Sequence, residues 1–387
     1  MFIKKSSIIY IFAISLFIIT TMLSNTMWIH IYGDSFEKVL KFIRYGSYLT
    51  CLFQIINIEF NRKDFYKILL FTGCTCICSY ISTNKTVFLY VFLFVAAYKM
   101  IPNLIINVFL FIQSSLLTII IISSQIGINI DYIFGVGERN RHGLGFDWTT
   151  TAPIIYFYIT LEYIFIRNKK MKLYEYFILE IINIFFYSMT DSRMSFLLLS
   201  LSIFCFFLLS NIRYIERFIM KVRKIFIFLP SVIAVFSIFI HTFYQSDSRI
   251  WNKLNILLSN RLALGNSAIK KYGIKLWGQN IKWVGYSYKE NSGVYNYVDC
   301  SYLQILLEYG IVFLLICVLM YSYILYKAYQ ENNIYLCCCI IIILVFSITE
   351  PRLLNLMYNP FPLLAVSYLR SKERGSKNVL LKDGIVI

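Results

Sequence analysis

The chain has 387 residues, of which 59% are hydrophobic and only 15% are charged, and it carries a formal net charge of +17. A soluble globular domain is about half apolar and about a quarter charged, so this composition excludes an ordinary soluble protein. Apolar runs recur along the whole sequence without a low-complexity linker, which predicts one all-α, polytopic membrane domain over residues 1–387.

Apolar runs of about 17–25 residues, the length of a spanning helix, recur about twelve times. The predicted spans begin near Ser7, Leu40, Tyr66, Thr86, Leu104, Ala152, Leu173, Met194, Ile225, Ser301, Ile334 and Leu353. The first run has no small-residue cleavage site and further spans follow it, so we interpret it as an anchor rather than a signal peptide. Pro153, Pro230 and Pro362 lie near predicted helix ends, where proline is tolerated.

Lysine and arginine are concentrated in alternate connections between these spans. The basic segments are Lys4–Lys5, Arg62–Lys67, Lys99, Arg167–Lys172, Arg213–Lys224, Lys327 and Arg370–Lys382. Basic residues favour the cytoplasmic side of a membrane, so we expect these segments and both termini there. This bias explains most of the net charge, and because the sequence has no base-reading module we expect no nucleic-acid partner.

Cysteine is frequent, but its positions do not indicate a metal site. Nearly all ten cysteines fall in predicted spans, where a thiol behaves as a small apolar group. The clusters Cys74-Thr-Cys-Ile-Cys and Cys337–Cys339 have no histidine or acidic ligand nearby at zinc spacing. We therefore expect neither a metal nor a disulfide.

Two connections that we expect on the outer face are long, at residues 125–151 and 243–300. Helix connections usually have about 2–8 residues, and longer ones are often functional. The second loop begins with a stretch that can form an amphipathic helix on the membrane surface. Its apolar face comprises Ile250, Leu254, Leu257, Leu258 and Leu262, whereas Arg249, Lys253 and Asn260 lie elsewhere.

The same loop is rich in aromatic and basic residues. The aromatic residues are Trp277, Trp283, Tyr286, Tyr288, Tyr295 and Tyr297. Flat rings among amides suit sugars, although tryptophan and tyrosine also anchor proteins at the headgroup level. The basic residues, Arg249 and Arg261 among them, suit an anionic ligand such as a lipid pyrophosphate. The alternative is a solvated charged face beside anionic headgroups.

Charged residues also stand where apolar spans meet the outer surface. Asp191-Ser192-Arg193 and Thr349-Glu350-Pro351-Arg352 each separate two apolar runs. Charges at such depth are costly and are usually functional or mutually paired. Arg141, His142 and Asp147 in the first long loop add to the same face. We interpret His241, at the end of a span, as an interfacial histidine rather than a base.

Four short patterns occur in order between Arg141 and Ile311. Leu257-Leu-Ser-Asn-Arg-Leu-Ala-Leu, followed by Tyr272-Gly-Ile-Lys-Leu-Trp-Gly-Gln, resembles the large outer loop of Wzy-type polysaccharide repeat-unit polymerases. Val298-Asp-Cys-Ser-Tyr-Leu-Gln-Ile-Leu-Leu-Glu-Tyr-Gly-Ile resembles the start of the helix after that loop. Arg141-His-Gly-Leu-Gly-Phe and Thr190-Asp-Ser-Arg-Met-Ser resemble two upstream patterns. Family members often carry His-Pro-Asn after the first Gly-Phe, where this chain has Asp147-Trp-Thr-Thr. The related ligases often place histidine where Asp299 stands here, which favours a polymerase.

The resemblance implies an enzyme of the bacterial cytoplasmic membrane whose active site faces outward. Such an enzyme joins oligosaccharides linked to undecaprenyl pyrophosphate into O-antigen, capsule or exopolysaccharide, and it needs neither metal nor other cofactor. A sugar hydroxyl of one unit attacks the anomeric carbon of another, and undecaprenyl pyrophosphate leaves. Positioned cations would stabilise the leaving group, and a base would accept the hydroxyl proton. Membrane lipid, a chain-length regulator and other polysaccharide-assembly proteins are the expected partners.

The expected catalytic residues are Arg261, which would grip the pyrophosphate, Arg193 as a further cation, and Asp299 as the base or acceptor-orienting group. Tyr302 would position Asp299, although Asp299 could instead be a helix N-cap. The expected substrate contacts are Arg141, His142, Arg249, Trp277, Trp283, Tyr302 and Arg352.

Three other functions remain open from the sequence. A ligase that transfers finished polymer to another acceptor shares the topology and the long loops. A lipid-linked oligosaccharide flippase would have a similar number of helices but short loops. A structural subunit of an envelope complex would have no chemistry of its own.

Overall fold

The computed structural model describes residues 5–136, 139–285 and 295–369. Two aromatic residues of the second long loop, Tyr286 and Tyr288, lie outside the described residues, as do Lys4 and the basic segment Arg370–Lys382. The described chain is mostly helical, as the composition predicts.

Sixteen α-helices occur in the described residues. They are α1 (Lys5–Leu23), α2 (Trp28–Ile56), α3 (Arg62–Ser82), α4 (Thr86–Ala96), α5 (Pro102–Gln125), α6 (Thr151–Arg167), α7 (Leu173–Thr190), α8 (Arg193–Asn211), α9 (Arg213–Val222), α10 (Leu229–Thr242), α11 (Arg249–Leu257), α12 (Arg261–Tyr272), α13 (Ser301–Glu308), α14 (Gly310–Gln330), α15 (Ile334–Phe346) and α16 (Leu364–Ser367). The 3-10 helices are η1 (Asn168–Lys170), η2 (Ile225–Phe228) and η3 (Phe361–Leu363).

Five helical segments are long and apolar enough to cross a membrane, judged by length and composition among the described residues. They are α3, α5, α8, Ile225–Thr242 (η2 with α10) and α14. Ser7–Leu23, Thr86–Ala96 and Ile334–Phe346 are shorter apolar helices. Large apolar side chains are exposed on these and other helices; Tyr80, for example, is 86% exposed and Phe111 is 72% exposed. Several long apolar helices with exposed apolar surface suggest a multi-pass membrane protein.

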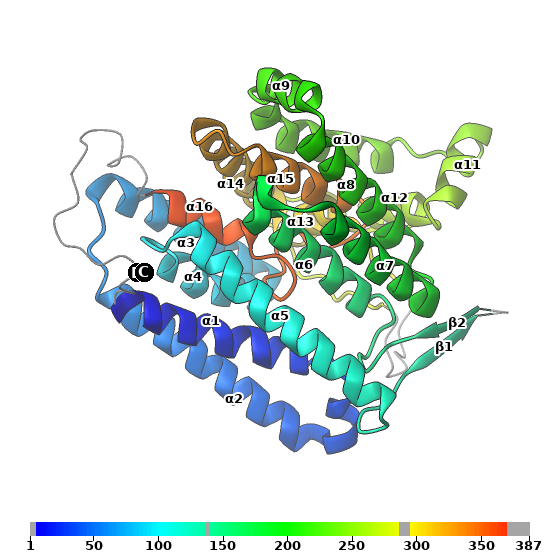
Figure 1. The fold of residues 1–387 in the computed structure, drawn as a ribbon, viewed down its shortest axis with the longest axis horizontal. Helices are drawn as coiled ribbons and strands as arrows, with labels where there is room; N and C mark the ends of the chain where they lie inside the picture. The colour runs from blue at the N-terminus through cyan, green and yellow to red at the C-terminus, as the bar shows by residue number, and fades with distance from the viewer. Residues whose placement is uncertain (1–4, 137–138, 286–294, 370–387) are drawn as a thin grey trace.

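The centre of the helical body is α6, and almost all of its side chains are buried. Helices α1 to α5 lie on one side of it and α7 to α10 on the other (Figure 1). It packs against α5, α7, α8 and α15. The ring of Phe157 stacks on Phe346 of α15 with their centroids 4.1 Å apart. A helix that is mostly apolar on every face is expected in such a central position, although α6 also buries one carboxyl group, that of Glu162.

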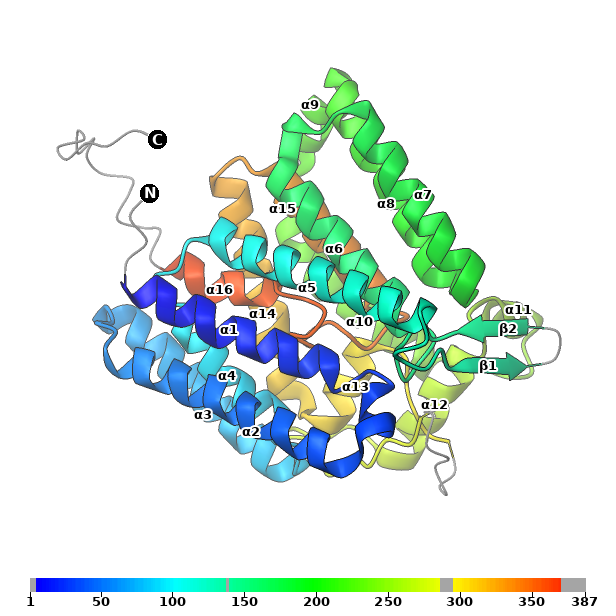
Figure 2. The same cartoon turned by 60° about the horizontal axis from the view of Figure 1, so that its bottom comes forward.

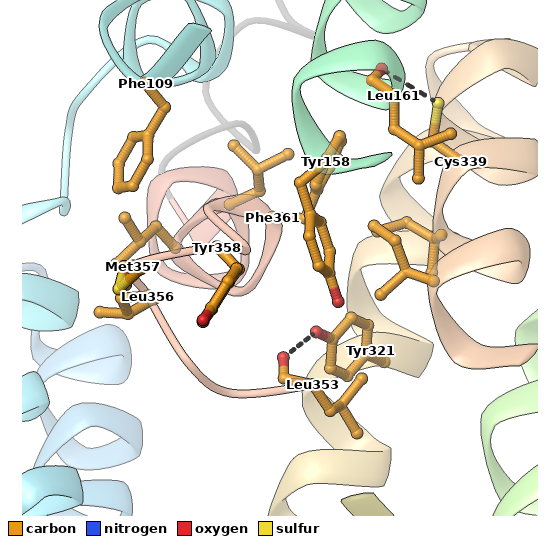
Figure 3. Close-up of a cluster of buried hydrophobic side chains, with 14 of the residues drawn as sticks. Phe109, Tyr158, Leu161, Tyr321, Cys339, Leu353, Leu356, Met357, Tyr358 and Phe361 are labelled. Atoms are coloured by element: carbon orange, nitrogen blue, oxygen red, sulfur yellow. Dashed lines mark hydrogen bonds between the residues drawn. The ribbon is translucent and has the colours of Figure 1, made fainter. Parts of the chain in front are cut away.

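The predicted span at Leu353 is wrong, because the chain there does not form one continuous helix. Residues 351–360 are irregular and lead into η3 and the short α16. Pro360 and Pro362 lack the amide hydrogens that a helix interior requires. The buried Asn359 donates from Nδ2 to the Leu353 carbonyl at 2.8 Å. The Tyr321 hydroxyl donates to the same carbonyl at 2.8 Å (Figure 3). Side chains thus satisfy irregular backbone inside the helical body.

The predicted span at Ser301 is divided into α13 and α14 at Gly310. Residues 275–279 run against this junction, where Gln279 N donates to Glu308 O at 3.0 Å and Ile311 N donates to Lys275 O at 3.1 Å. Gly310 has φ +89°, and a Cβ there would collide with backbone atoms of Gly278 and Leu276. The second long loop is therefore fixed to the start of α14 through backbone contacts that only glycine permits.

The two long loops contain regular structure and lie at one end of the helical body (Figure 2). The first contains an antiparallel hairpin of β1 (Ile133–Val136) and β2 (Arg139–His142), paired with Ile133 opposite His142. This hairpin departs from the all-α expectation. In the second loop, Ser259 and Asn260 have φ of +54° and +64° and separate α11 from α12. The expected amphipathic face is therefore split, with Leu257 73% exposed and Leu262 only 2% exposed.

We predict that Gly310→Ala lowers the stability of the protein by about 2–3 kcal/mol, because alanine is strained at this φ and its Cβ has no room. Thermal unfolding in detergent micelles measures the effect. Gly46→Ala in α2 is the matched control, because a Cβ there meets nothing within 4 Å. Equal unfolding temperatures for the two variants would contradict the role given to Gly310.

Candidate functional site

A pocket of about 770 Å³ lies where the two long loops meet the helical body. We call it the arginine pocket, because four arginines from separate segments line it. Its charged lining residues are Arg141, Asp147, Asp191, Arg193, Arg261, Asp299, Glu350 and Arg352. Trp148, Trp283, Tyr295, Tyr297 and Tyr358 supply its aromatic walls.

Arg261, the first residue of α12, lies between two carboxylates. Its Nε donates to Asp299 Oδ2 at 3.1 Å, and its Nη2 donates to Glu350 Oε1 at 3.1 Å. The side chains of Arg261, Asp299 and Glu350 are 19%, 24% and 9% exposed. Burial acts against the charge of Arg261, but Glu350 and Asp299 outweigh it and raise the pKa of the guanidinium above its ordinary value. Burial also raises the pKa of Glu350, although Arg261 lowers it.

Asparagines fix the position of Arg261. The buried Asn255 donates from Nδ2 to Asn260 Oδ1 at 3.0 Å and accepts from Ala263 N at 3.0 Å, which closes the turn between α11 and α12. Asn266 donates from Nδ2 to the His241 carbonyl at 2.8 Å, which attaches α12 to the end of α10. These bonds hold Arg261 at the edge of the pocket.

Ser301 brings the two carboxylates together. Its hydroxyl donates to the Glu350 carbonyl at 2.7 Å and accepts from Leu353 N at 3.1 Å. Its backbone N–H donates to Ser347 O at 2.9 Å. Because Ser301 follows Asp299 by two residues, these bonds fix the segments of Asp299 and Glu350 side by side.

The other three arginines have different environments. Arg193 Nε is 3.3 Å from Asp191 Oδ1, and its side chain is 64% exposed. Arg141 Nε donates to the Thr190 carbonyl at 2.8 Å. The Arg352 guanidinium carbon lies 4.9 Å from the centroid of the Tyr358 ring.

Four carboxylates balance the four arginines, so formal charge alone does not identify a ligand. The decisive feature is that two of the arginines have N–H groups without hydrogen-bond partners among the described residues. Arg261 Nη1 and Arg352 Nε are buried and have no hydrogen-bond partner among the residues that the structure describes. A buried donor without a partner costs about 1–3 kcal/mol, more for a charged group, and usually indicates a missing ligand or water. Because both residues line the arginine pocket, an anion bound there would lie beside both guanidinium groups.

Asp147 is the pocket carboxylate best suited to accept a proton. Burial raises the pKa of Asp147 to about 6, although the charge of Arg352 acts in the opposite direction. It makes no salt bridge within the described ranges, whereas Asp299 and Glu350 are both bound to Arg261. A base whose pKa is close to the working pH is effective because it is ionised and still basic.

The structure brings together six of the expected site residues. Arg141, Arg193, Arg261, Trp283, Asp299 and Arg352 all line the arginine pocket. Asp299 is not the N-cap of α13; that position belongs to Cys300.

The other four expected site residues do not line the pocket. His142 Nδ1 pairs with Asp131 Oδ2 at 2.6 Å, and Arg249 is exposed at the start of α11. Trp277 packs against the hydrophobic core. The Tyr302 hydroxyl donates to the Leu344 carbonyl at 2.8 Å, so it does not position Asp299. His241, interpreted from the sequence as interfacial, is 1% exposed and contacts Gly265 of α12.

An apolar groove adjoins the arginine pocket and shares Met194 with it. The groove has a volume of about 430 Å³ and lies between α8, α10, α11 and α15. Its lining includes Leu197, Leu201, Phe236, Leu254 and Val345. A larger apolar cavity of about 900 Å³ lies between α5, α6 and α7. Its Glu175 is already bound to Arg167.

Glu350 and Asp147 are the main residues that the expected site lacked. The sequence signal was present, because Glu350 stands between two apolar runs, but its pairing with Arg261 depends on segments far apart in the chain. Within the described ranges, no three His, Cys, Asp or Glu side chains gather closely enough to hold a metal ion. Comparisons with protein-family models, curated proteins and solved structures found no match for the chain.

We predict that Arg261→Ala destabilises the protein by about 2–4 kcal/mol, because two partly buried carboxylates lose their shared cation. Without Arg261 the pKa of Glu350 in the folded protein rises further. Folding then becomes less favourable once the pH exceeds the ordinary pKa of a glutamate, because the unfolded chain holds the ionised carboxylate more easily. The loss of unfolding free energy caused by Arg261→Ala should therefore be smaller at about pH 5 than at about pH 8. Thermal unfolding across this range measures it.

Lys270→Ala, on an exposed position of the same helix, controls for loss of a surface charge. If the loss of stability in Arg261→Ala does not change with pH, the pairing of Arg261 with Glu350 is contradicted.

Proposed function

We propose that the chain is a membrane polymerase that joins oligosaccharide units carried on a lipid pyrophosphate into a surface polysaccharide. The observation that carries this proposal is the pair of buried donors, Arg261 Nη1 and Arg352 Nε, left without partners in the described part of the chain. Guanidinium groups suit pyrophosphate oxygens because they donate several hydrogen bonds in a fixed plane. The resemblance of four sequence patterns to Wzy-type polymerases supports the same reaction.

The lipid part of the substrate is supported by the apolar groove. The groove meets the arginine pocket at Met194 and is lined by aliphatic and aromatic side chains. A polyprenyl chain in the groove would leave its pyrophosphate beside Arg193 and Arg261. A soluble sugar nucleotide would have no use for such a groove.

In the proposed reaction, a hydroxyl of the acceptor sugar attacks the anomeric carbon of the donor sugar. A carbon–oxygen bond forms there, the bond from that carbon to the pyrophosphate oxygen breaks, and the lipid pyrophosphate leaves with the bonding electrons. Arg261 and Arg352 stabilise the negative charge that develops on the leaving group. The hydroxyl proton passes to a carboxylate of the pocket.

We assign the proton acceptor to Asp147, whereas the sequence pointed to Asp299. Asp299 accepts a hydrogen bond from Arg261 at 3.1 Å, which suits it to orient the guanidinium. Asp147 has no such cation bound, and burial raises its pKa to about 6.

We also propose about twelve membrane crossings, the last of them formed by the irregular segment after α15 with η3 and α16 and not by a continuous helix. Both termini would then lie in the cytoplasm and the pocket on the outer face. The short helices α4 and α15 would cross together with the residues that adjoin them, whereas α13 would lie on the outer side beside the second long loop. The basic segments Arg62–Lys67, Arg167–Lys172 and Arg213–Lys224 would then lie on the inner side.

We predict that a strain without this gene loses the long-chain polysaccharide ladder while single repeat units still reach the surface. Complementation with the wild type should restore the ladder, and Arg261→Ala should lower polymer formation about 100-fold or more, as expected for loss of a charge-stabilising contact. Lys270→Ala should behave as the wild type. Gel electrophoresis of surface polysaccharide is the measurement, with protein levels checked by immunoblot.

Other gel patterns would indicate the competing functions. Polymer that accumulates on the lipid carrier would indicate a ligase. Repeat units trapped on the inner leaflet would indicate a flippase, and an unchanged ladder would reject all three activities.

We predict that polymerisation by the purified enzyme slows as the pH falls below about 6, because protonated Asp147 cannot accept the hydroxyl proton. Asp147→Asn should lower the rate about 10²–10⁴-fold and remove this pH dependence. Asp299→Asn should lower the rate but keep the inflection near the same pH. If Asp299→Asn removes the inflection and Asp147→Asn does not, Asp299 is the base.

A further inference from the structure

A second, smaller cavity adjoins the arginine pocket. This side chamber has a volume of about 230 Å³ and shares Trp283, Tyr297, Pro351 and Arg352 with the pocket. These four residues therefore form the partition between the two spaces. Sites for drug-sized ligands usually measure about 300–1,000 Å³, so the side chamber fits one ring rather than an extended chain.

The walls of the side chamber differ in chemistry from those of the arginine pocket. Its polar residues are Asn84, Thr86, Ser301, Gln304, Glu308 and Asn355, and its aromatic residues are Tyr90, Trp283, Tyr297 and Tyr309. Arg352, in the partition, is the one cation among these lining residues. Amides and hydroxyls beside aromatic rings suit a neutral ligand with several hydroxyl groups.

Glu308 makes one wall rigid. Its Oε1 accepts from Asn84 Nδ2 at 2.6 Å, and its Oε2 accepts from the indole Nε1 of Trp283 at 2.9 Å. The side chain of Glu308 is almost fully buried at 5% exposure. The Trp283 ring also meets the Tyr297 ring edge-on, with their centroids 6.4 Å apart. The indole is therefore held in place before any ligand arrives, which reduces the entropy lost on binding.

Gln304 supplies an unused hydrogen-bond donor in the same chamber. Its Nε2 is buried and has no partner among the residues that the structure describes. A buried amide without a partner costs about 1–3 kcal/mol. A ligand hydroxyl or ring oxygen would remove that cost.

We propose that the side chamber binds one neutral sugar ring of the acceptor unit, with the donor sugar and its pyrophosphate on the other side of the partition. This inference rests on the proposed function and adds a place for the second substrate. The acceptor hydroxyl would meet the anomeric carbon at Trp283 and Arg352, where the two spaces touch. Glu308 acts as a positioning residue, because its contacts hold Asn84 and Trp283.

Calorimetric titration of the purified full-length protein in detergent tests this arrangement with two probes. One probe is inorganic pyrophosphate, and the other is the repeat-unit oligosaccharide released from its lipid and phosphate by mild acid. The wild type should bind both at the same time. Gln304→Leu should weaken oligosaccharide binding about tenfold, the value of one hydrogen bond, and leave pyrophosphate binding unchanged. Arg261→Ala should weaken pyrophosphate binding and leave oligosaccharide binding unchanged.

Gln330→Leu, at the exposed far end of α14, is the matched control and should bind both probes as the wild type does. Asn84→Ala tests the same wall from another segment if Gln304→Leu fails to fold. Unchanged oligosaccharide binding by folded Gln304→Leu or Asn84→Ala would overturn the side-chamber proposal, as would mutual exclusion of the two probes. Oligosaccharide binding without pyrophosphate binding in the wild type would reject the lipid-pyrophosphate donor and keep the sugar site.

Discussion

The paired charges of Arg261 constrain everything around the pocket. A guanidinium removed from water costs several kcal/mol unless carboxylates with good geometry compensate it. Asp299 and Glu350 provide that compensation from segments 38 and 89 residues away in the chain. The backbone must therefore bring three distant turns to one point, and the hydrogen bonds of Ser301 and Asn255 keep them there. The shape of the pocket follows from this requirement.

Much of the helical arrangement could be predicted from the sequence, because an apolar run of sufficient length has few alternatives in a membrane. Helices begin at Thr86, Leu173 and Ile334, where the spans were predicted to begin. The prediction failed at Leu353, since the run is apolar overall but contains two prolines, which interrupt a helix, and two asparagines, which disfavour one. Irregular backbone is tolerated there only because Tyr321, Asn359 and other side chains satisfy it, and no local pattern reveals such distant partners.

In the candidate site, too, local sequence patterns indicate some residues, whereas others depend on contacts between distant parts of the chain. Charges between apolar runs are conspicuous in a sequence because they are costly there, and this is why Arg193 and Arg352 could be selected. Arg261 was selected as a basic residue of a long loop. Residue type alone could not separate them from His142, whose ring is engaged by Asp131. Gln304 and Glu308 were not selected as site residues, although they lie within the sequence pattern that begins at Val298. They lie in a run that looks like part of a span, and only the approach of Trp283 and Asn84 gives them a role.

The irregular segment after α15 has a consequence for the biogenesis of the protein. Residues 350–358 complete the arginine pocket, yet they leave the ribosome after every helix that surrounds it. Earlier helices can insert while Arg261 still lacks one of its two carboxylates. A nascent chain therefore contains the finished site only after residues 350–358 have been synthesised and placed beside α12.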